Sequence, residues 1–270
     1  MMTLAHVRIV LVEPAGPLNV GAIARVMKNM GLHHLVLVNP QCDCLSAEAQ
    51  RMAVHATDVL TDARRVATLP EALRGCDRAI ATTARSRSLP TLLESPRIAL
   101  PWLLQTQEQQ NEIPAAALIF GPEDRGLSNV ELNYAQRFIS IPTSPIYPSL
   151  NLAQAVAICC YELHLLYASR TNQNGDPVST PDPDTPTFCP EIEDVDFPVL
   201  SDAAATSDVL EGYYQQLETL LLKIGYLYPH TVASRMGKFR RMFNRARLSP
   251  AEVSMLRGIL RQMEWALHSN

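Results

Sequence analysis

The alternation of apolar runs with helical patterns constrains the fold of this chain most. Short apolar runs lie near residues 6–12, 35–38, 77–83, 115–120 and 137–141. Helical patterns fill the spaces near residues 19–30, 46–60, 97–110 and 149–168. Strands that alternate with helices form parallel sheets, because each crossover helix returns the chain to the edge where the previous strand began. We therefore predict an α/β fold with a parallel sheet and helices on both of its faces.

Charge divides the chain into three parts. Residues 1–170 hold 14 basic and 14 acidic residues, residues 171–205 hold eight acidic and no basic residues, and residues 206–270 hold nine basic and five acidic residues. The middle part also carries six prolines and no periodic pattern, so it buries too little apolar surface to order itself. We predict a folded domain over 1–170, an acidic proline-rich linker over 171–205 and a second folded unit over 206–270.

The last part of the chain has clear helix boundaries. A helical pattern near 207–224 ends at Gly225, and another begins around Pro229. Ser249 and Glu252 then have the spacing of a capping box at the start of a third helix. These signals predict a small α-helical domain.

The second of these helices carries six basic residues between 235 and 247 and no acidic residue. Basic helix faces are often merely solvated, but a run with charges of one sign favours contact with nucleic-acid phosphates. Such contacts would supply affinity rather than base selection. The candidate RNA-binding residues are Arg235, Lys238, Arg240, Arg241 and Arg245.

Three apolar runs of the first part end in loops rich in glycine, proline or hydroxyl residues, and each loop leads into a helix. The segments are 13–25, 120–128 and 139–157. Glycines allow close backbone approach, and prolines fix backbone angles and remove donors, so a ligand would be held through backbone atoms. Ser149 stands where an N-cap would. The segments predict a small-molecule site, and each alone also fits an ordinary strand-to-helix loop.

The helix that begins near Asn19 predicts the direction of one arginine. An apolar stripe at helical spacing should face the core, and its members are Val20, Ile23, Met27 and Met30. The opposite side carries Gly21, Arg25, Lys28 and Asn29. Arg25 is therefore predicted to point away from the core.

Taken in order, these segments resemble a known family. The motifs are N-x-G-x-x-x-R from Asn19 to Arg25, F-G-P-E-D-R-G-L-S over 120–128, and I-P…Y-P-S-L-N-L-A-Q-A-V over 141–156. They look like the SPOUT methyltransferases, in the branch that methylates the ribose 2′-oxygen of RNA. The tail, with G-Y-L-Y-P-H from 225, K-F-R-R-M-F from 238 and L-R-G-I-L-R-Q from 256, looks like that of the bacterial TrmJ-type enzymes. The resemblance covers nearly all of the chain except 171–205.

The resemblance implies a fold, a reaction and partners. It implies a deep trefoil knot in the parallel-sheet domain, S-adenosylmethionine held in the knot, and a homodimer whose site is completed across the interface. The tail implies a tRNA (cytidine/uridine-2′-O-)-methyltransferase that acts on nucleotide 32, cytidine and/or uridine, of the tRNA anticodon loop. Two alternatives stay open: 2′-O-methylation of ribosomal RNA or another tRNA position, and a non-catalytic RNA-binding or assembly protein of the same fold.

Carried over by position, the resemblance also implies site residues. The methyl donor would contact, mostly through backbone atoms, Thr82, Thr83, Ala84, Gly121, Glu123, Ile141, Pro142, Pro148, Ser149, Leu150 and Asn151. Arg25 is the first candidate for catalysis, because an arginine keeps its proton and would stabilise negative charge on the 2′-oxygen rather than act as a base. Asn19 would orient Arg25. Arg85 and Arg87 would hold RNA or shape the acceptor site, unless they are solvated surface arginines.

Other observations narrow the class of protein. The N-terminus has no basic region followed by an apolar stretch, and no run of about 18 apolar residues occurs, so we expect a cytoplasmic protein without a membrane partner.

The six cysteines include no C-x-x-C pair, and we expect them to be reduced and structural. Cys42 and Cys44 with two nearby histidines are weak evidence for a metal, so we assign none. The first strand is not followed by G-x-G-x-x-G, which excludes a nicotinamide-binding Rossmann enzyme.

Overall fold

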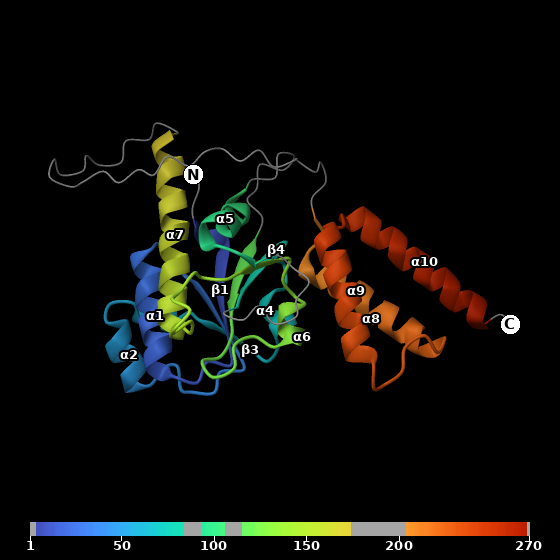
Figure 1. Cartoon of the computed structure of the whole chain (residues 1–270), viewed down its shortest axis with the longest axis horizontal. Coiled ribbons are helices and arrows are strands. Elements are labelled where there is room, and N and C mark those ends of the chain that lie inside the picture. The colour runs from blue at the N-terminus through green and yellow to red at the C-terminus, as the bar shows by residue number, and fades with distance from the viewer. Residues whose placement is uncertain (1–3, 84–92, 106–114, 174–203, 269–270) are drawn as a thin grey trace.

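The chain forms a parallel sheet covered by helices, with three further helices beside it (Figure 1). The computed structural model describes residues 4–83, 93–105, 115–173 and 204–268. Within these ranges the sheet has seven strands, all parallel, in the order β3-β2-β1-β6-β4-β7-β5. The predicted α/β architecture and the small helical part at the end of the chain are confirmed.

The described elements have the following bounds. The strands are β1 Val7–Val12, β2 His34–Val38, β3 Arg64–Val66, β4 Arg78–Thr82, β5 Leu93–Glu94, β6 Ala116–Phe120 and β7 Arg137–Ile139. The helices of the sheet domain are η1 Leu4–His6, α1 Pro17–Asn29, α2 Ala47–Ala53, α3 Thr57–Thr61, α4 Leu69–Ala72, α5 Pro96–Ala99, η2 Leu100–Leu104, α6 Asn129–Leu132 and α7 Leu152–Gln173. The last three helices are α8 Ser207–Lys223, α9 Val232–Ala246 and α10 Pro250–His268.

The central strands are buried on both faces, which explains their continuous apolar sequences. β6 lies between β1 and β4, and Leu118 is in register with Ile9 on one side and Ile80 on the other. One face of the sheet packs against α1, α2, α3 and α7, and the other against α4 and α6. Figure 1 shows α1, α2 and α7 on the side away from the three last helices.

Several predicted boundaries were wrong. The pattern over 46–60 forms two short helices, α2 and α3, because Val54 between them has a positive φ of 55°. The pattern near 97–110 is a short α-helix followed by a 3-10 helix, and residues 106–114 lie outside the described part. The short strands β3 and β5 were not predicted.

Two positions in the helices also differ from prediction. Gly21 is buried rather than exposed, since a Cβ on it would lie 2.2 Å from the Ala49 carbonyl oxygen of α2. The N-cap before α7 is Asn151, not Ser149: Asn151 Oδ1 accepts from the backbone N–H of Ala153 at 2.8 Å and of Gln154 at 3.4 Å. An asparagine side chain is at least as good a cap as serine, so the helix begins two residues later than its apolar pattern indicates.

Helix α7 is long and apolar enough to cross a membrane by length and composition alone. Its inner side carries Val156, Cys159, Cys160 and Leu163, which are buried in the same core as α1. One side of α7 therefore belongs to the core, while 33% of its apolar window Leu152–Ser169 is buried in all. Cys44 and Cys76 are buried as well, in agreement with a structural role for these thiols.

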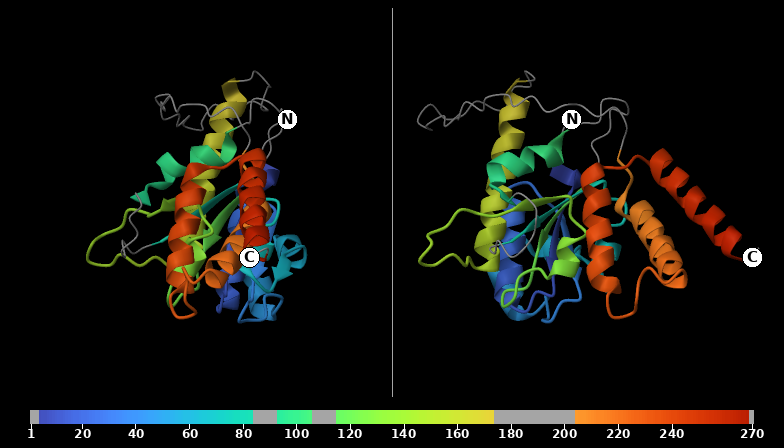
Figure 2. Two further views of the ribbon diagram at one scale, coloured as in Figure 1. Left: turned by 90° about the vertical axis from the view of Figure 1, so that its right-hand side faces the viewer. Right: turned by 45° about the vertical axis from the view of Figure 1, so that its right-hand side comes forward.

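Helices α8, α9 and α10 form a separate core, the C-terminal unit, around Tyr213, Tyr214 and Leu217. The unit packs on the face of the sheet domain that carries α4 and α6 (Figure 2). Ser207 anchors its first helix, because both its backbone N–H and its hydroxyl donate to the Cys76 carbonyl at 3.0 and 3.1 Å. Ala205 is also buried in this core, and its backbone N–H donates to the Leu248 carbonyl at 2.6 Å.

Candidate functional site

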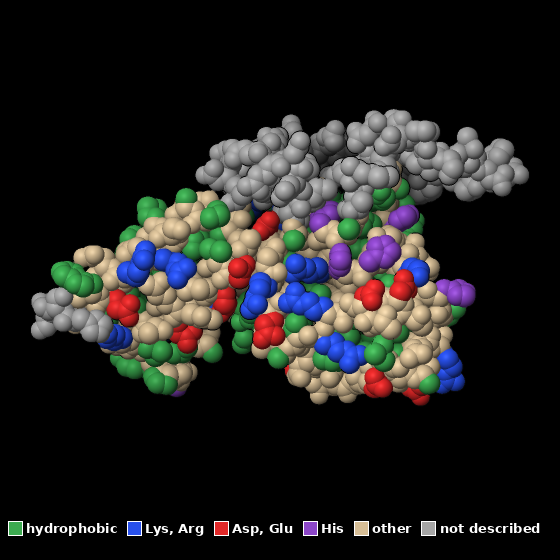
Figure 3. All heavy atoms as spheres, turned by 180° about the vertical axis from the view of Figure 1, so that it is seen from behind, with side chains coloured by type: hydrophobic (Ala, Val, Ile, Leu, Met, Phe, Trp, Pro, Cys, Tyr) green, Lys and Arg blue, Asp and Glu red, His purple; other side chains and the backbone are tan. Residues whose placement is uncertain are grey.

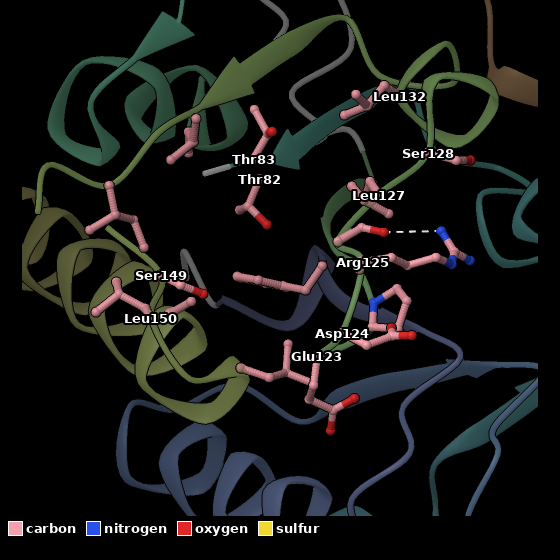
Figure 4. A pocket seen from close by; sticks show the side chains of 18 of the residues that line it. Thr82, Thr83, Glu123, Asp124, Arg125, Leu127, Ser128, Leu132, Ser149 and Leu150 are labelled. Atoms are coloured by element: carbon pink, nitrogen blue, oxygen red, sulfur yellow. Dashed lines mark hydrogen bonds between the residues drawn. The ribbon is translucent and has the colours of Figure 1, made fainter. Parts of the chain in front are cut away.

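A cavity of about 390 Å³ opens at the carboxyl ends of β4, β6 and β7. Ligands of open parallel sheets bind at this edge, and the volume lies within the usual range for small-molecule sites. Its walls come from the three strand ends, from the loop between β6 and α6, and from the loop between β7 and α7. In Figure 4, Thr82 and Thr83 lie opposite Glu123 and Asp124, and Ser149 and Leu150 lie opposite Arg125 and Leu127.

Most of the predicted donor-binding residues lie around this cavity. Those that line it are Thr82, Thr83, Gly121, Glu123, Ile141, Pro148, Ser149 and Leu150. Pro142 and Asn151 lie next to lining residues without lining the cavity themselves. Ala84, Arg85 and Arg87 fall outside the described residues. The structure thus collects residues from three distant segments at one place.

The loop after β6 fits only glycine at its first position. A Cβ on Gly121 would lie 2.3 Å from the Leu127 nitrogen and 2.4 Å from the Gly126 carbonyl carbon, distances that real Cβ atoms do not show. Gly126 has a φ of +67°, which favours glycine. The loop therefore folds back on itself and leaves its backbone close to the cavity.

Arg125 fastens this loop to its neighbours. Its guanidinium donates to both carboxylate oxygens of Glu131 at 2.9 Å and to Glu13 Oε2 at 2.7 Å. Glu131 also completes a capping box with Ser128 at the start of α6. Burial favours a higher pKa for Glu131, but the hydrogen bonds from Arg125 and Ser128 outweigh it and lower the pKa. Arg125 was part of the predicted motif but was not chosen as a site residue.

Glu123 joins the loop after β1 to the loop after β6. Its carboxylate accepts from the backbone N–H groups of Ala15 and Gly16, both at 3.1 Å, and from Asn19 Nδ2 at 2.8 Å. Burial favours a higher pKa for Glu123, but these hydrogen bonds outweigh it, so the pKa is lowered. An ionised carboxylate with three donors is a poor proton acceptor, because those bonds stabilise its charged form.

Asn19 does not contact Arg25, contrary to the prediction that it orients that arginine. Its Oδ1 accepts from Asn151 Nδ2 at 2.9 Å, while its Nδ2 donates to Glu123. Asn19 therefore connects all three loops of the site. Arg25 lies six residues further along α1, exposed, and pairs with no other described residue. Its predicted outward direction is confirmed.

The five candidate RNA-binding residues of α9 fall into two groups. Arg235, Lys238 and Arg245 are exposed. Arg240 is largely buried: it donates to Glu211 Oε1 at 2.9 Å and lies over the rings of Tyr214 and Tyr134. Arg241 donates to Asn133 Oδ1 at 3.1 Å. Arg240 and Arg241 thus hold the protein together, because α9 packs against both α8 and α6.

Asn133 and Asn244 form the buried centre of the contact between the two parts. Asn244 Nδ2 donates to the Asn133 carbonyl at 2.7 Å, and the Tyr214 hydroxyl donates to Asn244 Oδ1 at 2.8 Å. Gly237 allows α9 to lie this close to Asn133, because a Cβ at position 237 would be 2.7 Å from Asn133 Nδ2. Nothing in the periodic pattern of α9 distinguished Asn244 from a solvated residue. The contact links α9 to α6, the helix that follows the cavity loop.

Two family models match the chain. The SpoU rRNA Methylase family matches residues 6–161, and the C-terminal domain of the tRNA methyltransferase TrmJ matches residues 208–270. The first match covers the sheet domain with the cavity, and the second covers the C-terminal unit. The two matches follow the division seen in the structure.

Similar proteins match along nearly the whole chain. The tRNA (cytidine/uridine/adenosine-2′-O-)-methyltransferase TrmJ of Pseudomonas aeruginosa (strain UCBPP-PA14) is 38% identical over 261 residues, which are 97% of this chain and 95% of that protein. The tRNA (cytidine/uridine-2′-O-)-methyltransferase TrmJ of Escherichia coli (strain K12) is also 38% identical, over 97% of this chain and 96% of that protein. The crystal structure of TrmJ from Z. mobilis ZM4 superposes with a TM-score of 0.74 at 28% identity, covering 95% of this chain and 98% of that one. The chain therefore belongs to the SpoU methylase family, and within it to the group of the TrmJ enzymes.

Proposed function

We propose that this protein transfers a methyl group from S-adenosylmethionine to the ribose 2′-oxygen of nucleotide 32, a cytidine or uridine, in the tRNA anticodon loop. The observation that carries the proposal is the cavity at the strand ends, built from three motif loops in a chain that matches tRNA 2′-O-methyltransferases over nearly its full length. A tRNA substrate also agrees with the expected cytoplasmic location.

The cavity fits S-adenosylmethionine, the methyl donor of this family. The donor supplies a methyl group on a positively charged sulfur. Gly121 lets the protein backbone approach the ligand closely, while Ile141 and Leu150 offer apolar surface. Thr82 is held in place because its hydroxyl donates to the Ile119 carbonyl at 3.0 Å. Glu123, lining the same cavity as an anion, favours a cationic ligand.

Arg25 is the residue that we assign to catalysis. An arginine stays protonated at physiological pH, so it stabilises negative charge that develops on the attacking 2′-oxygen and contacts a neighbouring phosphate. It does not line the cavity of its own chain. Its exposed position on α1 suits a site that a second copy of the chain completes.

The exposed apolar side chains near α7 support a homodimer. Tyr161 on α7 is 46% exposed, Ile98 on α5 is 57% exposed and Leu18 on α1 is 52% exposed. A closed twofold dimer that buries such a surface is the commonest homo-oligomer. In this arrangement Arg25 of one protomer would lie near the donor of its partner.

The C-terminal unit supplies affinity for tRNA in this proposal. Lys238 and Arg245 are exposed on α9 and suit phosphate contacts, as does Arg235, which is exposed while it donates to the Tyr226 carbonyl. Phosphate contacts position the RNA, and selection of the anticodon loop would depend on its shape and unstacked bases. Two alternatives keep this role for the C-terminal unit. In the first, a ribose at another RNA position reaches the cavity; in the second, the protein binds RNA without methylating it.

The proposal is tested by incubating the full chain with S-adenosylmethionine and unmodified tRNA, followed by nuclease digestion and mass spectrometry. A 2′-O-methyl group at nucleotide 32 is the expected result, and the nucleoside identity gives the base preference. Methylation at another ribose, or of ribosomal RNA alone, would replace the proposed substrate while keeping the reaction. No transfer to either RNA, with tRNA binding intact, would support the non-catalytic alternative.

A further inference from the structure

The turn between α8 and α9, residues 224–231, presents aromatic rings to solvent. Tyr226 is 52% exposed and Tyr228 is 54% exposed, and His230 is exposed beside them. Between them only Leu227 turns inward to the core of the C-terminal unit. Three exposed rings thus lie within five residues of the chain, and tyrosine, which combines an apolar ring with a polar hydroxyl, is enriched at binding surfaces.

A network of backbone hydrogen bonds holds the turn in one shape. The N–H groups of Tyr226 and Leu227 both donate to the Leu221 carbonyl at 3.0 Å, and Gly225 has the positive φ of +76° that ends α8. On the other side, Thr231 N–H donates to the Tyr228 carbonyl at 2.8 Å. The rings therefore stand on a rigid frame, which lowers the entropy cost of binding a ligand to them.

The rings of the turn have different neighbours, and Tyr226 also lies against Phe239, with ring centroids 6.4 Å apart at an interplanar angle of 55°. Tyr228 and His230 are stacked, with ring centroids 5.9 Å apart and an interplanar angle of 20°. Tyr226 has the guanidinium of Arg235 5.5 Å from its ring centroid, and Arg235 also donates to the Tyr226 carbonyl at 3.0 Å. Stacked aromatic and guanidinium planes are the surfaces on which unpaired nucleobases stack.

The charge around the turn matches an RNA ligand. No acidic residue occurs between positions 224 and 247 of the sequence. Lys238 is exposed one helical turn beyond Arg235. A base stacked on the turn would therefore have cationic side chains beside its phosphates and no carboxylate of this segment to repel it.

We propose that the α8–α9 turn is a stacking site for an unpaired base of the RNA, with Tyr228 and Tyr226 as the stacking surfaces and Lys238 as a phosphate contact. This inference rests on the proposed function and names the part of the RNA that the C-terminal unit holds. In Figure 1 the turn lies at the lower end of the C-terminal unit, the same end of the molecule as the loop after β1. Figure 3 shows apolar side chains at this lower end of the unit and also along its upper edge.

The test compares Tyr228→Ala and Tyr228→Phe in the full chain. Binding is measured by fluorescence anisotropy with tRNA, with a hairpin RNA that has an unpaired loop, and with a blunt RNA duplex of equal length. Loss of one stacked base weakens binding roughly 5- to 100-fold. We expect this loss for Tyr228→Ala with tRNA and the hairpin but not with the duplex, and we expect Tyr228→Phe to bind like the unchanged protein.

Two control variants separate stacking from other effects. Met255→Ala removes a side chain that is 61% exposed on α10, outside the turn, and should leave affinity unchanged. Lys238→Ala should lower the slope of log affinity against log salt by about 0.7 for one lost single-strand phosphate contact, whereas Tyr228→Ala should leave the slope unchanged.

The outcomes distinguish this inference from the proposed function. Equal losses with hairpin and duplex, or no rescue by phenylalanine, would overturn the stacking site, even if methyl transfer to nucleotide 32 is observed. A smaller assembly mass for Tyr228→Ala in light scattering, at unchanged RNA affinity, would show that the turn binds protein instead. If Tyr228→Ala loses hairpin binding and the unchanged protein methylates another RNA, the stacking site is supported and only nucleotide 32 is rejected as the methylated position.

Discussion

The cavity loops and helix α9 both carry residues that the sequence marks for ligand binding, but the structure uses them differently. Around the cavity, eight of the eleven predicted donor residues line one space. On α9, Arg240 and Arg241 bond to side chains of α8 and of the end of α6, whereas Lys238 and Arg245 are exposed and Arg235 is exposed while it donates to the Tyr226 carbonyl. The three cavity loops follow from local sequence and their donor residues from the family resemblance, whereas the role of a charged helix face depends on what packs against it.

The largest expected effect is on the rate of methyl transfer. Arg25→Ala should slow transfer on the order of 10² to 10³-fold, because a preorganised positive group is lost, and should leave the affinity for S-adenosylmethionine nearly unchanged. Lys28→Ala is the matched control, since Lys28 lies on the same helix and pairs with Asp58 at 2.8 Å. Methyl-transfer kinetics and calorimetry separate the two quantities. A comparable loss of donor affinity in Arg25→Ala would contradict this division of roles.

The backbone nature of the cavity is tested at Gly121. Gly121→Ala should lower the free energy of unfolding by about 3 kcal/mol, the upper end for overpacking, because its Cβ meets backbone atoms that cannot move aside. Donor binding should fall as well. Gly258→Ala on α10 is the control: a Cβ there meets nothing within 4 Å, and the change should stabilise the helix by up to about 1 kcal/mol. Denaturant unfolding measures both, and equal stability of the two variants would contradict the close approach.

Substitutions at two neighbouring positions test the difference between the buried and the exposed polar residues of α9. Asn244→Ala removes the donor to the Asn133 carbonyl and the nearer acceptor of the Tyr214 hydroxyl, which keeps only the Arg240 carbonyl at 3.5 Å, and should cost about 2 kcal/mol of unfolding free energy. Arg245→Ala, one residue further, should leave stability unchanged and weaken tRNA binding. Thermal unfolding and an RNA titration of both variants provide the measurement. The distinction fails if Arg245→Ala is the less stable of the two.

The smallest expected effect is a pH dependence at the cavity loop. The pKa of Glu131 is lowered from its ordinary value of 4.5 in the folded protein, so its bonds to Arg125 contribute stability above that pH and lose it as the pH falls through the folded pKa. The unfolding free energies of the unchanged protein and Glu131→Gln should differ by less than about 1 kcal/mol at pH 7, because Arg125 is partly exposed. The difference should shrink as the pH falls below 4.5. A difference that grows on acidification would show that the carboxylate is not stabilised in its ionised form.

The sequence by itself determined the parallel α/β architecture, the three cavity loops and the helix boundaries near Gly225 and Ser249. Each depends on interactions between residues close in the chain: continuous apolar runs, a glycine that ends a helix, and a capping box. The capping box of Ser249 and Glu252, predicted from its spacing, is present: the Glu252 N–H donates to Ser249 Oγ at 3.3 Å, and the Ser249 N–H donates to Glu252 Oε2 at 2.7 Å.

Only the tertiary structure decided which polar side chains would find protein partners. Asn19 contacts Glu123 and Asn151 from loops more than 100 residues away, and Asn244 is buried against Asn133 at a similar separation. A helical pattern gives the direction of a side chain but not the element that covers it, so Arg240 and Lys238 look alike in sequence. Their difference arises because α6 and α8 pack against one side of α9 and leave the other side to solvent.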